Sequence, residues 1–466
     1  MLQPRPPIVV ILGHVDHGKT TLLDSLHKTN LAAREVGGIT QSTRSFQGEF
    51  QISNFTRGAR EPSRFQITFI DTPGHAAFSQ MRTRGGKIAD MAILVVAATD
   101  GVMPQTKESI ATIKSAGIPM IVAINKIDIP GATADTVKAQ LTENGVLVEG
   151  FGGNVPAVAI SAKTGAGLPE LLEMIHLVSS LNPPQADPDG ALVCIVLESH
   201  LDARRGPLAT CIVKNGTLRI GQELFLDKLV GKAKALTPPI APPSTPVEIL
   251  GLTSVIPVGS ALSSTIHPQN LASSIQRPPS TEPKVKLILK ADVLGSLEAI
   301  TASLPSEVYI ISAGTGDIIE SDILLAAATQ AQIVGFNVRV SSSTAKLAEN
   351  EKIKIYEFKI IYELLDQVNL LVNPKNNEEI KGRAEIKAEF KIANQRIAGA
   401  LVTQGEISKS DIIKIAGIAT HIKSLKLGKV ETDKVKTGQE FGIVFSPYLD
   451  FKIGDNIIAL KIHGQA

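Results

Sequence analysis

Five short motifs contain glycine, lysine, threonine or aspartate, residue types that bind phosphate groups and metal ions. The first motif, Gly13-His14-Val15-Asp16-His17-Gly18-Lys19-Thr20, is followed by Thr21 and matches G-x-x-x-x-G-K-[ST]. Its two glycines let the backbone close around a phosphate with N–H groups pointing inward. Lys19 would neutralise β- and γ-phosphate oxygens, and the Thr20 hydroxyl would ligate Mg²⁺. The motif predicts a phosphate-binding loop, or P-loop.

The second motif, Asp71-Thr-Pro-Gly74-His75, follows an apolar run at Phe65–Ile70. An acid at this strand end can hold Mg²⁺ through a water molecule, so Asp71 is a candidate metal residue. Gly74 can bring its N–H close to the γ-phosphate and sense whether that group is present. Asp-Thr-Pro-Gly alone is an ordinary turn, but a P-loop upstream favours the functional interpretation.

The third motif, Asn125-Lys126-Ile-Asp128, follows the apolar run Met120–Ile124. A carboxylate here can accept both N1–H and N2–H of guanine. Adenine offers no such pair, so Asp128 would be left unpaired against it. The Asn125 side chain can brace the base site and the Lys126 stem can lie over the ring. These residues predict selectivity for guanine.

Two weaker motifs complete the set. Ser161-Ala162-Lys163 follows the run Ala157–Ile160, and its backbone N–H groups can bind guanine O6. Gly37-Gly38-Ile39-Thr40-Gln41 lies between the P-loop and Asp71, where a mobile loop could close over Mg²⁺ and the γ-phosphate through Thr40. Together the motifs predict a GTP/GDP site with Mg²⁺, and hence a GTPase.

Apolar runs that alternate with helical patterns must position these motifs. That alternation predicts a parallel sheet with helices on both faces, whose ligand site lies at the carboxyl ends of the strands. The helical pattern after the P-loop covers Thr21–Lys28. The expected strands are Ile8–Leu12, Phe65–Ile70, Ala92–Ala97, Met120–Ile124 and Ala157–Ile160.

The chain beyond the first proline-rich stretch, Asn182–Gly190, changes its pattern. Short alternating strands begin near Ala191, and Asn215-Gly216 predicts a hairpin turn between two of them. Two further proline-rich stretches, Thr237–Pro246 and Arg277–Pro283, indicate linkers or loops. This segment is expected to form a small β-barrel.

Residues 284–358 return to an α/β pattern. Helices are expected to open after Ser321 and near Ser341, which are plausible N-caps. Apolar residues at helical spacing in Ile360–Val372 predict a connecting helix. The expected strands of this domain are Val285–Lys290, Val308–Ala313, Ile333–Val340 and Ile353–Phe358.

Two distant segments share one sequence pattern, an internal repeat that forms an echo of the first segment in the second. Leu208–Gln222 and Ile397–Asp411 share apolar positions and the glycines at 216 and 405, and Val258-Gly259-Ser260 matches Ile453-Gly454-Asp455. The echo predicts two barrels of one type. The expected fold is an α/β P-loop GTPase domain (1–182), a β-barrel (190–280), a small α/β domain (284–359), a connecting helix (360–374) and a C-terminal β-barrel (380–466).

Composition sets broad limits on function. Aromatic residues are 4% of the 466 residues and Trp is absent, which argues against base stacking as a main route to nucleic acid. From Lys381 onward, 14 Lys and Arg face 9 Asp and Glu, which suits either a polyanion or a solvated basic face. Cys194 and Cys211 lie in apolar runs and are expected to be core residues of a reducing compartment. No signal peptide or membrane span is evident, so a cytoplasmic location is expected.

The motifs resemble those of a known family. GHVDHGKTTLLD, GGITQ, DTPGHAAF, DGVMPQT and NKID are similar to the translational GTPases, in particular to the family of bacterial translation initiation factor 2. GPLATCIVKNGTLRIGQ, PSTPVEILGL, KADVLGSLEAI, NVRV, IIYELLDQV and IAGALVTQGEI extend the resemblance over nearly the whole chain.

The resemblance implies a function and its residues. The GTP form would bind the small ribosomal subunit and initiator formylmethionyl-tRNA, promote joining of the large subunit, and leave after that subunit triggers hydrolysis. His75 would orient the attacking water, Thr40 would contact Mg²⁺ directly and Asp71 through water. Asp16 would help to hold a monovalent cation. The chain would act as a monomer with no membrane partner.

The sequence departs from the family in several places. Ala400 and Phe441 stand where relatives often carry cysteine, and the region after Ile412 lacks the usual arginine-containing turn. Either a pocket wall has changed with the tRNA pocket retained, or tRNA selectivity is lost. The P-loop begins by residue 13, which indicates a minimal or truncated version, and Glu49–Arg64 suggests a longer hairpin connection.

Other classes remain possible from the residues alone. A specialised elongation factor would not be expected to place an α/β domain at 284–358 between two barrels. NKID argues against a P-loop ATPase or kinase, and His75 argues against a nucleotide-gated scaffold without activity.

Overall fold

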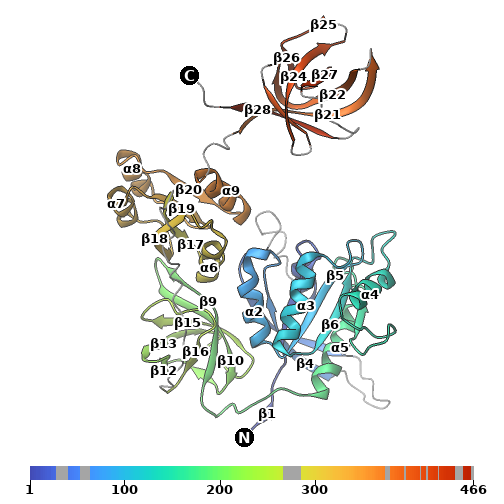
Figure 1. Ribbon diagram of the computed structural model, residues 1–466. Helices are drawn as coiled ribbons and strands as arrows, with labels where there is room; N and C mark the ends of the chain where they lie inside the picture. The colour runs from blue at the N-terminus through green and yellow to red at the C-terminus, as the bar shows by residue number, and fades with distance from the viewer. Residues whose placement is uncertain are drawn as a thin grey trace. The chain divides into compact units, whose positions relative to one another are not determined.

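The computed structural model describes ten stretches of the 466-residue chain (Figure 1). They are 1–27, 40–52, 63–265, 285–372, 378–392, 395–409, 411–415, 418–428, 430–446 and 455–462. The chain forms two compact units, Met1–Val368 and Asn369–Ala466. The first contains a GTPase-like domain, a barrel and a small α/β domain, and the second contains another barrel.

The first domain is built on a six-stranded sheet in the order β3-β4-β2-β5-β6-β7. Five of its strands are parallel, and β3 pairs antiparallel with β4 at one edge. Every residue of β2 and β5 is buried, as expected for a sheet covered on both faces. The strands are β2 (Ile8–Gly13), β3 (Arg44–Ile52), β4 (Ser63–Asp71), β5 (Met91–Ala97), β6 (Met120–Asn125) and β7 (Ala157–Ala159).

Helices cover both faces of this sheet (Figure 1). Helices α1 and α5 pack with Val9 and Ile11 on one face, and α2, α3 and α4 pack with Val10 and Leu12 on the other. This alternation follows from the period of two along a strand. The helices are α1 (Lys19–His27), the 3-10 turn η3 (Ala76–Phe78), α2 (Ser79–Ile88), α3 (Pro104–Ala116), α4 (Ala134–Glu143) and α5 (Leu168–Leu181).

The middle barrel is a closed ring of strands in the order β10-β15-β13-β12-β16-β9. Cys194 and Cys211 are free thiols in its core, as the sequence predicted. The ring strands are β9 (Val193–Asp202), β10 (Gly206–Asn215), β12 (Glu223–Phe225), β13 (Leu229–Thr237), β15 (Pro246–Leu252) and β16 (Ala261–Ser263).

The hairpin predicted at Asn215-Gly216 is wrong. Strand β10 ends at Asn215, but the next strand, β11 (Leu218–Arg219), pairs with β14 (Ile240–Ala241) and not with β10. Gly216, with φ of +72°, instead turns the chain out of the barrel wall. A sequence pattern records the need for positive φ, but it does not say which strand will be the partner.

The middle barrel is tied to the GTPase-like domain by buried polar contacts. Lys214 Nζ donates to Ile88 O (2.8 Å) and lies 3.1 Å from Asp90 Oδ1. Ser244 O accepts a 2.6 Å hydrogen bond from Thr68 Oγ1. Ser244 lies within the proline-rich stretch 237–246, so that stretch is a packed loop containing β14 rather than a linker.

The small α/β domain is a four-stranded parallel sheet in the order β18-β17-β19-β20. Three helices lie between its strands, and the connecting helix α9 follows β20. The strands are β17 (Val285–Ala291), β18 (Val308–Thr315), β19 (Gln332–Phe336) and β20 (Ile355–Phe358), and the helices are α6 (Leu294–Ser303), α7 (Glu320–Thr329), α8 (Ser342–Asn350) and α9 (Ile361–Val372).

Two local predictions in this domain differ from the structure. The N-cap of α7 is Ile319, not Ser321, because the Asp322 carboxylate accepts the Ile319 N–H and closes the first turn. Strand β19 ends at Phe336, four residues earlier than expected, because Asn337 has a φ of +52°. The N-cap predicted at Ser341 is confirmed, since its hydroxyl accepts from Thr344 N.

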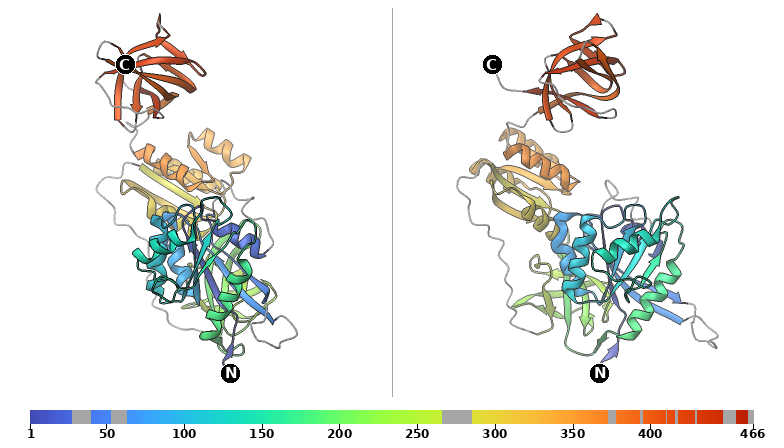
Figure 2. Two further views of the ribbon diagram at one scale, coloured as in Figure 1. Left: turned by 90° about the vertical axis from the view of Figure 1, so that its right-hand side faces the viewer. Right: turned by 45° about the vertical axis from the view of Figure 1, so that its right-hand side comes forward.

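The C-terminal unit contains a second ring of six strands (Figures 1 and 2). Its path β21-β28-β23-β24-β27-β22 is joined end to end by the pairing of β21 with β22. The ring strands are β21 (Glu378–Ile392), β22 (Gln395–Ser408), β23 (Ile412–Ile415), β24 (Ile418–Leu427), β27 (Glu440–Ser446) and β28 (Asn456–Ile462).

The two rings have the same strand order. One ring becomes the other when its strands are exchanged in sequence order. The strands β9, β10, β12, β13, β15 and β16 of the middle ring correspond to β21, β22, β23, β24, β27 and β28 of the C-terminal ring. The two barrels of one type that the echo predicted are therefore confirmed, as is the overall fold class. The second part of the echo, at Ile453-Gly454, lies outside the described residues.

The expected hairpin connection at Glu49–Arg64 is shorter than predicted. Residues up to Ile52 belong to β3 and those from Ser63 belong to β4, and these strands pair in register along nine residues. Residues 53–62 lie outside the described part. None of the helices that the structure describes is both long and apolar enough to cross a bilayer.

Candidate nucleotide-binding site

Backbone conformations that require glycine shape the P-loop between β2 and α1. Gly13 and Gly18 have φ values of +147° and +87°. A Cβ on Gly13 would lie 2.3 Å from Val95 O, and one on Gly18 would lie 2.3 Å from Asn125 Nδ2. Asp16 is also left-handed, with φ of +61°. The loop is therefore packed closely against β5 and β6, and its shape depends on both glycines.

Lys19 is buried at the first position of α1. Its Nζ donates a 2.6 Å hydrogen bond to His14 O, within the P-loop itself. Burial lowers the pKa of Lys19 to about 8, and the nearby Asp71 carboxylate opposes this shift. A buried ammonium group in a loop of backbone N–H groups is a strong site for a phosphate anion.

Three oxygen-bearing side chains converge beside Lys19. Thr20 Oγ1 lies 2.5 Å from Thr40 Oγ1 and 3.5 Å from Asp71 Oδ2. They come from α1, from the loop before β3 and from the end of β4. Hydroxyl and carboxylate oxygens are the ligands that Mg²⁺ takes together with phosphate oxygens, so this donor set fits that ion.

Asn125 joins the P-loop to the motif Ser161-Ala162-Lys163. Its Nδ2 donates to His17 O (2.8 Å) and its Oδ1 accepts from Ala162 N (2.9 Å). Asp128 Oδ1 accepts a 2.7 Å hydrogen bond from Ser161 Oγ, which lowers the pKa of this exposed carboxyl. The predicted phosphate and base motifs are thus parts of one hydrogen-bonded assembly.

Lys126 and His17 flank this assembly near Asp100. Lys126 has a φ of +67°, and its Nζ lies 3.5 Å from Asp100 Oδ2. His17 is fully buried, and burial lowers its pKa to about 4. The imidazole of His17 is therefore neutral near pH 7 and adds no charge beside the phosphates.

His75 is held by its own local chain at the start of η3. Its Nδ1 accepts a 2.9 Å hydrogen bond from Ala77 N, so the ring proton of the neutral form is on Nε2. Arg82 is fully buried and donates to Pro73 O (2.9 Å) and His75 O (2.5 Å), while Glu108 Oε1 accepts from it at 2.6 Å. Burial, followed by the Arg82 charge, lowers the pKa of His75.

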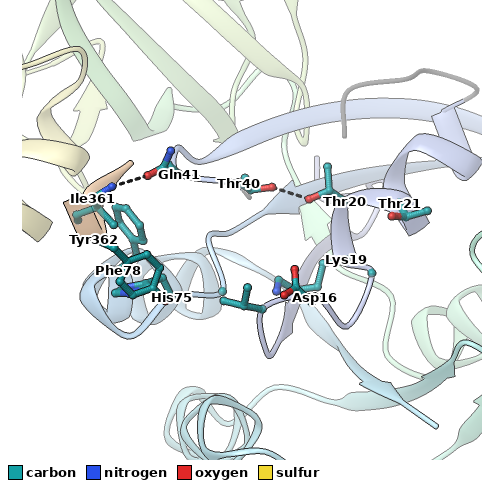
Figure 3. Close-up of a pocket in the computed structure, with 13 residues that line it drawn as sticks. Asp16, Lys19, Thr20, Thr21, Thr40, Gln41, His75, Phe78, Ile361 and Tyr362 are labelled. Atoms are coloured by element: carbon teal, nitrogen blue, oxygen red, sulfur yellow. Dashed lines mark hydrogen bonds between the residues drawn. The ribbon is translucent and has the colours of Figure 1, made fainter. Parts of the chain in front are cut away.

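A pocket of about 190 Å³ lies between the P-loop and His75 (Figure 3). Gln41, which lines this pocket, contacts the start of the connecting helix α9. Its Oε1 accepts from Ile361 N (3.1 Å) and its Nε2 donates to Lys359 O (2.8 Å). The lining residues are Val15, Asp16, Gly18, Lys19, Thr20, Thr21, Thr40, Gln41, Gly74, His75, Phe78, Ile361 and Tyr362.

Comparison with known proteins identifies the family. Residues 5–180 match the elongation factor Tu GTP binding domain, 191–265 match elongation factor G domain 2, and 262–369 match translation-initiation factor 2. Translation initiation factor IF-2 of Halothermothrix orenii is 40% identical over 98% of this chain and 72% of its own length. The chain belongs to the translation initiation factor IF-2 family. The IF-2 of Carboxydothermus hydrogenoformans is 42% identical over 99% of this chain.

The IF-2 relatives differ in the share of their length that this chain covers. The chain spans 60% of the Carboxydothermus hydrogenoformans protein and 55% of the IF-2 of Moorella thermoacetica. Among solved structures, GDP-bound aIF5B from Aeropyrum pernix is 24% identical, with a TM-score of 0.46 over 98% of this chain and 92% of that chain.

The structure gathers the predicted IF-2 site residues into two groups. The phosphate group contains the P-loop, Thr21, Thr40, Gly74 and His75, with Asp71 beside Thr20. The base group contains Asn125, Lys126, Asp128 and residues 161–163, of which Lys163 is exposed. Gly37, Gly38 and Ile39 lie outside the described residues.

Four functional neighbours were missed by sequence reasoning. Gln41 was noted only as part of a motif, and Arg82, Gln105 and Tyr362 were given no role. Gln105 Oε1 accepts from Val15 N at 3.0 Å and so braces the P-loop from α3. Gln105 and Tyr362 stand in the quoted segments DGVMPQT and IIYELLDQV, but residue type and spacing alone do not show which nucleotide-site residues they will contact.

Proposed function

We propose that this chain is a Mg²⁺-dependent GTPase of translation initiation. The observation that carries the proposal is the Asn125 bridge from His17 O to Ala162 N, because it makes the phosphate and base motifs a single site. Backbone N–H groups of the P-loop and Lys19 would hold the phosphates. Thr20, Thr40 and Asp71 would hold Mg²⁺, which when bound neutralises charge on the phosphate oxygens. Asp16 would help to hold a monovalent cation beside them.

Asp128 would select guanine. Ser161 Oγ donates one hydrogen bond to Asp128 Oδ1, and the remaining lone pairs of the carboxylate can accept N1–H and N2–H of the base. Ser161, Ala162 and Lys163 would offer backbone N–H groups to guanine O6, and the Lys126 stem would lie over the ring. An excess of GDP should displace labelled GTP, and ATP should not.

Hydrolysis would proceed by attack of water on the γ-phosphorus. The bond from that phosphorus to the β–γ bridging oxygen breaks, giving GDP and inorganic phosphate. His75 would orient the water, and Gly74 would sense the γ-phosphate through its N–H. No arginine is among the described residues that line the pocket. Basal hydrolysis should therefore be slow, and binding to the large ribosomal subunit would have to complete the site.

The C-terminal barrel would bind the formylmethionyl end of initiator tRNA. It carries a pocket of about 630 Å³ whose walls are largely apolar and whose flanks include Lys387 and Lys426. Apolar walls suit a methionyl side chain, and lysines suit the phosphates of an RNA acceptor end.

Two of the departures from the family pattern, Ala400 and Phe441, line this pocket and also belong to the core of the barrel. Ala400 on β22 and Phe441 on β27 are cross-strand partners, and both are buried. A small residue opposite a large one preserves volume across a strand pair. This complementarity favours a changed pocket wall over loss of the pocket.

The test of the proposal is GTP hydrolysis with and without ribosomes, by wild type and by His75→Ala. A slow basal rate that ribosomes raise by orders of magnitude supports it, and His75→Ala should lower the stimulated rate by about 100-fold or more. His200→Ala, a half-buried histidine on β9, is the matched control and should retain the wild-type rate. Fast turnover without ribosomes, or no ribosome effect, would leave a GTPase but remove the role in translation.

The remaining assignments follow from family membership. The partners would be both ribosomal subunits, through rRNA and protein, and formylmethionyl-tRNA. The chain would work in the cytoplasm as a monomer, and sedimentation at micromolar concentration tests the oligomeric state.

A further inference from the structure

His75 is withdrawn from the phosphate side of the pocket. In Figure 3 its ring lies with Phe78 and Tyr362, whereas Lys19 and Thr20 lie across the pocket from it. Its Nδ1 is occupied by the N–H of Ala77, and its Nε2 then carries the ring proton. A ring in this state cannot accept a proton from water at either nitrogen. His75 must change its position or its tautomer before it can assist hydrolysis.

Among the described residues, Tyr362 is the aromatic residue that packs most closely on His75. The two ring centroids are 4.1 Å apart at an interplanar angle of 76°, the edge-to-face arrangement that aromatic rings favour. The Phe78 centroid is more distant, at 6.0 Å from that of His75. Tyr362 comes from the first turn of α9, almost 300 residues beyond the histidine that it contacts.

The first turn of α9 is fixed to the loop that carries Thr40. Gln41 is buried and uses both ends of its amide, accepting from Ile361 N and donating to Lys359 O. Ile361 itself is fully buried. The Tyr362 ring is therefore placed by the segment that carries Thr40 and Gln41, so a shift of that segment would move Tyr362 relative to His75.

We propose that Tyr362 is a positioning residue that keeps His75 in this withdrawn state and thereby keeps basal GTP hydrolysis slow. The inference rests on the proposed GTPase function. Release of the ring from His75 frees the histidine to turn toward the attacking water. An aromatic contact of this kind can change the relative populations of two side-chain states about two- to tenfold.

The experiment measures single-turnover GTP hydrolysis without ribosomes, together with the dissociation constant for GTP. Tyr362→Ala should raise the hydrolysis rate about fivefold and leave the dissociation constant unchanged. Tyr362→Phe keeps the ring and should behave as wild type. The double variant Tyr362→Ala/His75→Ala should show no rise, because the effect acts through the histidine.

Two further variants separate this effect from a general loss of structure. Tyr309→Ala removes a tyrosine of nearly equal exposure, 44% against 46% for Tyr362, from strand β18 of the adjoining small α/β domain. It should leave the rate unchanged. Tyr362→Leu keeps apolar bulk on α9 but removes the ring, and it should reproduce the rise seen with alanine.

The outcomes distinguish the two proposals. If wild type hydrolyses GTP on ribosomes but Tyr362→Ala and Tyr362→Leu have an equal or lower basal rate, the role of Tyr362 is wrong and the GTPase proposal stands. A rise that persists when His75 is also replaced would likewise overturn it. If wild type neither binds nor hydrolyses GTP with ribosomes present, both proposals fail.

Discussion

The two barrels have one strand order but differ at one outward-facing pair that shapes their surfaces. In the middle barrel, Thr210 on β10 pairs with Glu248 on β15. The echo places Gly399 at the position of Thr210, and Gly399 pairs with Gly442 on β27. Both glycines line the 630 Å³ pocket. The hollow in the C-terminal barrel therefore lies where two side chains are missing.

The two barrels also differ in what covers their outer faces. Its outer face is occupied by contacts with the two neighbouring domains, through Lys214, Ser244 and Glu198. Within its own unit, the C-terminal barrel keeps an open pocket on that face. One architecture thus serves as a joint in the first case and, we propose, as a binding module in the second. The function follows from the residues on the surface and not from the strand order.

The largest effect is expected at the glycine that both barrels share. Gly216 and Gly405 have nearly equal φ values, +72° and +70°. A Cβ would lie 2.8 Å from Gly190 O in the first case and 2.1 Å from Lys381 O in the second. Gly405→Ala should therefore destabilise its barrel by about 3 kcal/mol, and Gly216→Ala by about 2 kcal/mol. Urea unfolding followed by circular dichroism measures both.

The same pair tests whether the two units are energetically separate. Gly405→Ala should leave the dissociation constant for GTP unchanged, because its strain lies in the C-terminal unit. A weaker GTP affinity in Gly405→Ala would show that the C-terminal barrel supports the nucleotide site. A larger loss of stability in Gly216→Ala than in Gly405→Ala would show that the distance from the added Cβ to the backbone oxygen does not determine the order of the two effects.

The second effect concerns the contact between the middle barrel and the small α/β domain. Glu198 on β9 is buried, its Oε1 accepts from Gly295 N (3.0 Å) at the start of α6, and its Oε2 has no hydrogen-bond partner among the described residues. Burial, with a smaller contribution from the nearby acids Asp292 and Glu298, raises the pKa of Glu198 to about 7, although the N–H groups of Gly295 and Ser199 oppose the shift. An acid whose pKa is higher in the folded state destabilises that state as pH rises between the two pKa values.

Stability should therefore fall between about pH 4.5 and pH 7, by up to about 3 kcal/mol from this group. Glu198→Gln removes the ionisation, so it should raise the thermal midpoint at pH 8 and flatten its dependence on pH. Glu223→Gln replaces an exposed acid of the same barrel and should follow the wild-type curve. Equal pH dependence in Glu198→Gln and wild type would show that Glu198 is not the group responsible.

The parts that could be predicted from sequence are those encoded by contiguous residues. The P-loop and the Asn125–Asp128 motif each follow a buried strand, so their placement at the sheet edge follows from the parallel topology. The paired barrels were predictable because the echo repeats apolar spacing and a glycine with positive φ. The edge strand β3 was not among the expected strands, because residues 49–52 were assigned to the hairpin connection and not to a strand.

Other features depend on contacts between distant segments. Nothing near Tyr362 shows that it will lie on His75, and Asn215-Gly216 does not reveal that β10 pairs with β9 and β15. The barrel pocket is equally hidden, because it is built from four strands and depends on a Gly–Gly pair that exists only in the folded register.

The smallest expected effect is on that pocket. Gly442 lies on a strand without positive φ, and a Cβ there would come no closer than 3.4 Å to Ile397 Cγ2. Gly442→Val should therefore fold, fill part of the hollow and weaken binding of formylmethionyl-tRNA by about tenfold, or about 1.4 kcal/mol. Val430→Ala shortens an exposed side chain of the same barrel and serves as the control. Unchanged tRNA binding by a correctly folded Gly442→Val would mean that the hollow is not the ligand site, and the contrast between the two barrels would then be one of packing alone.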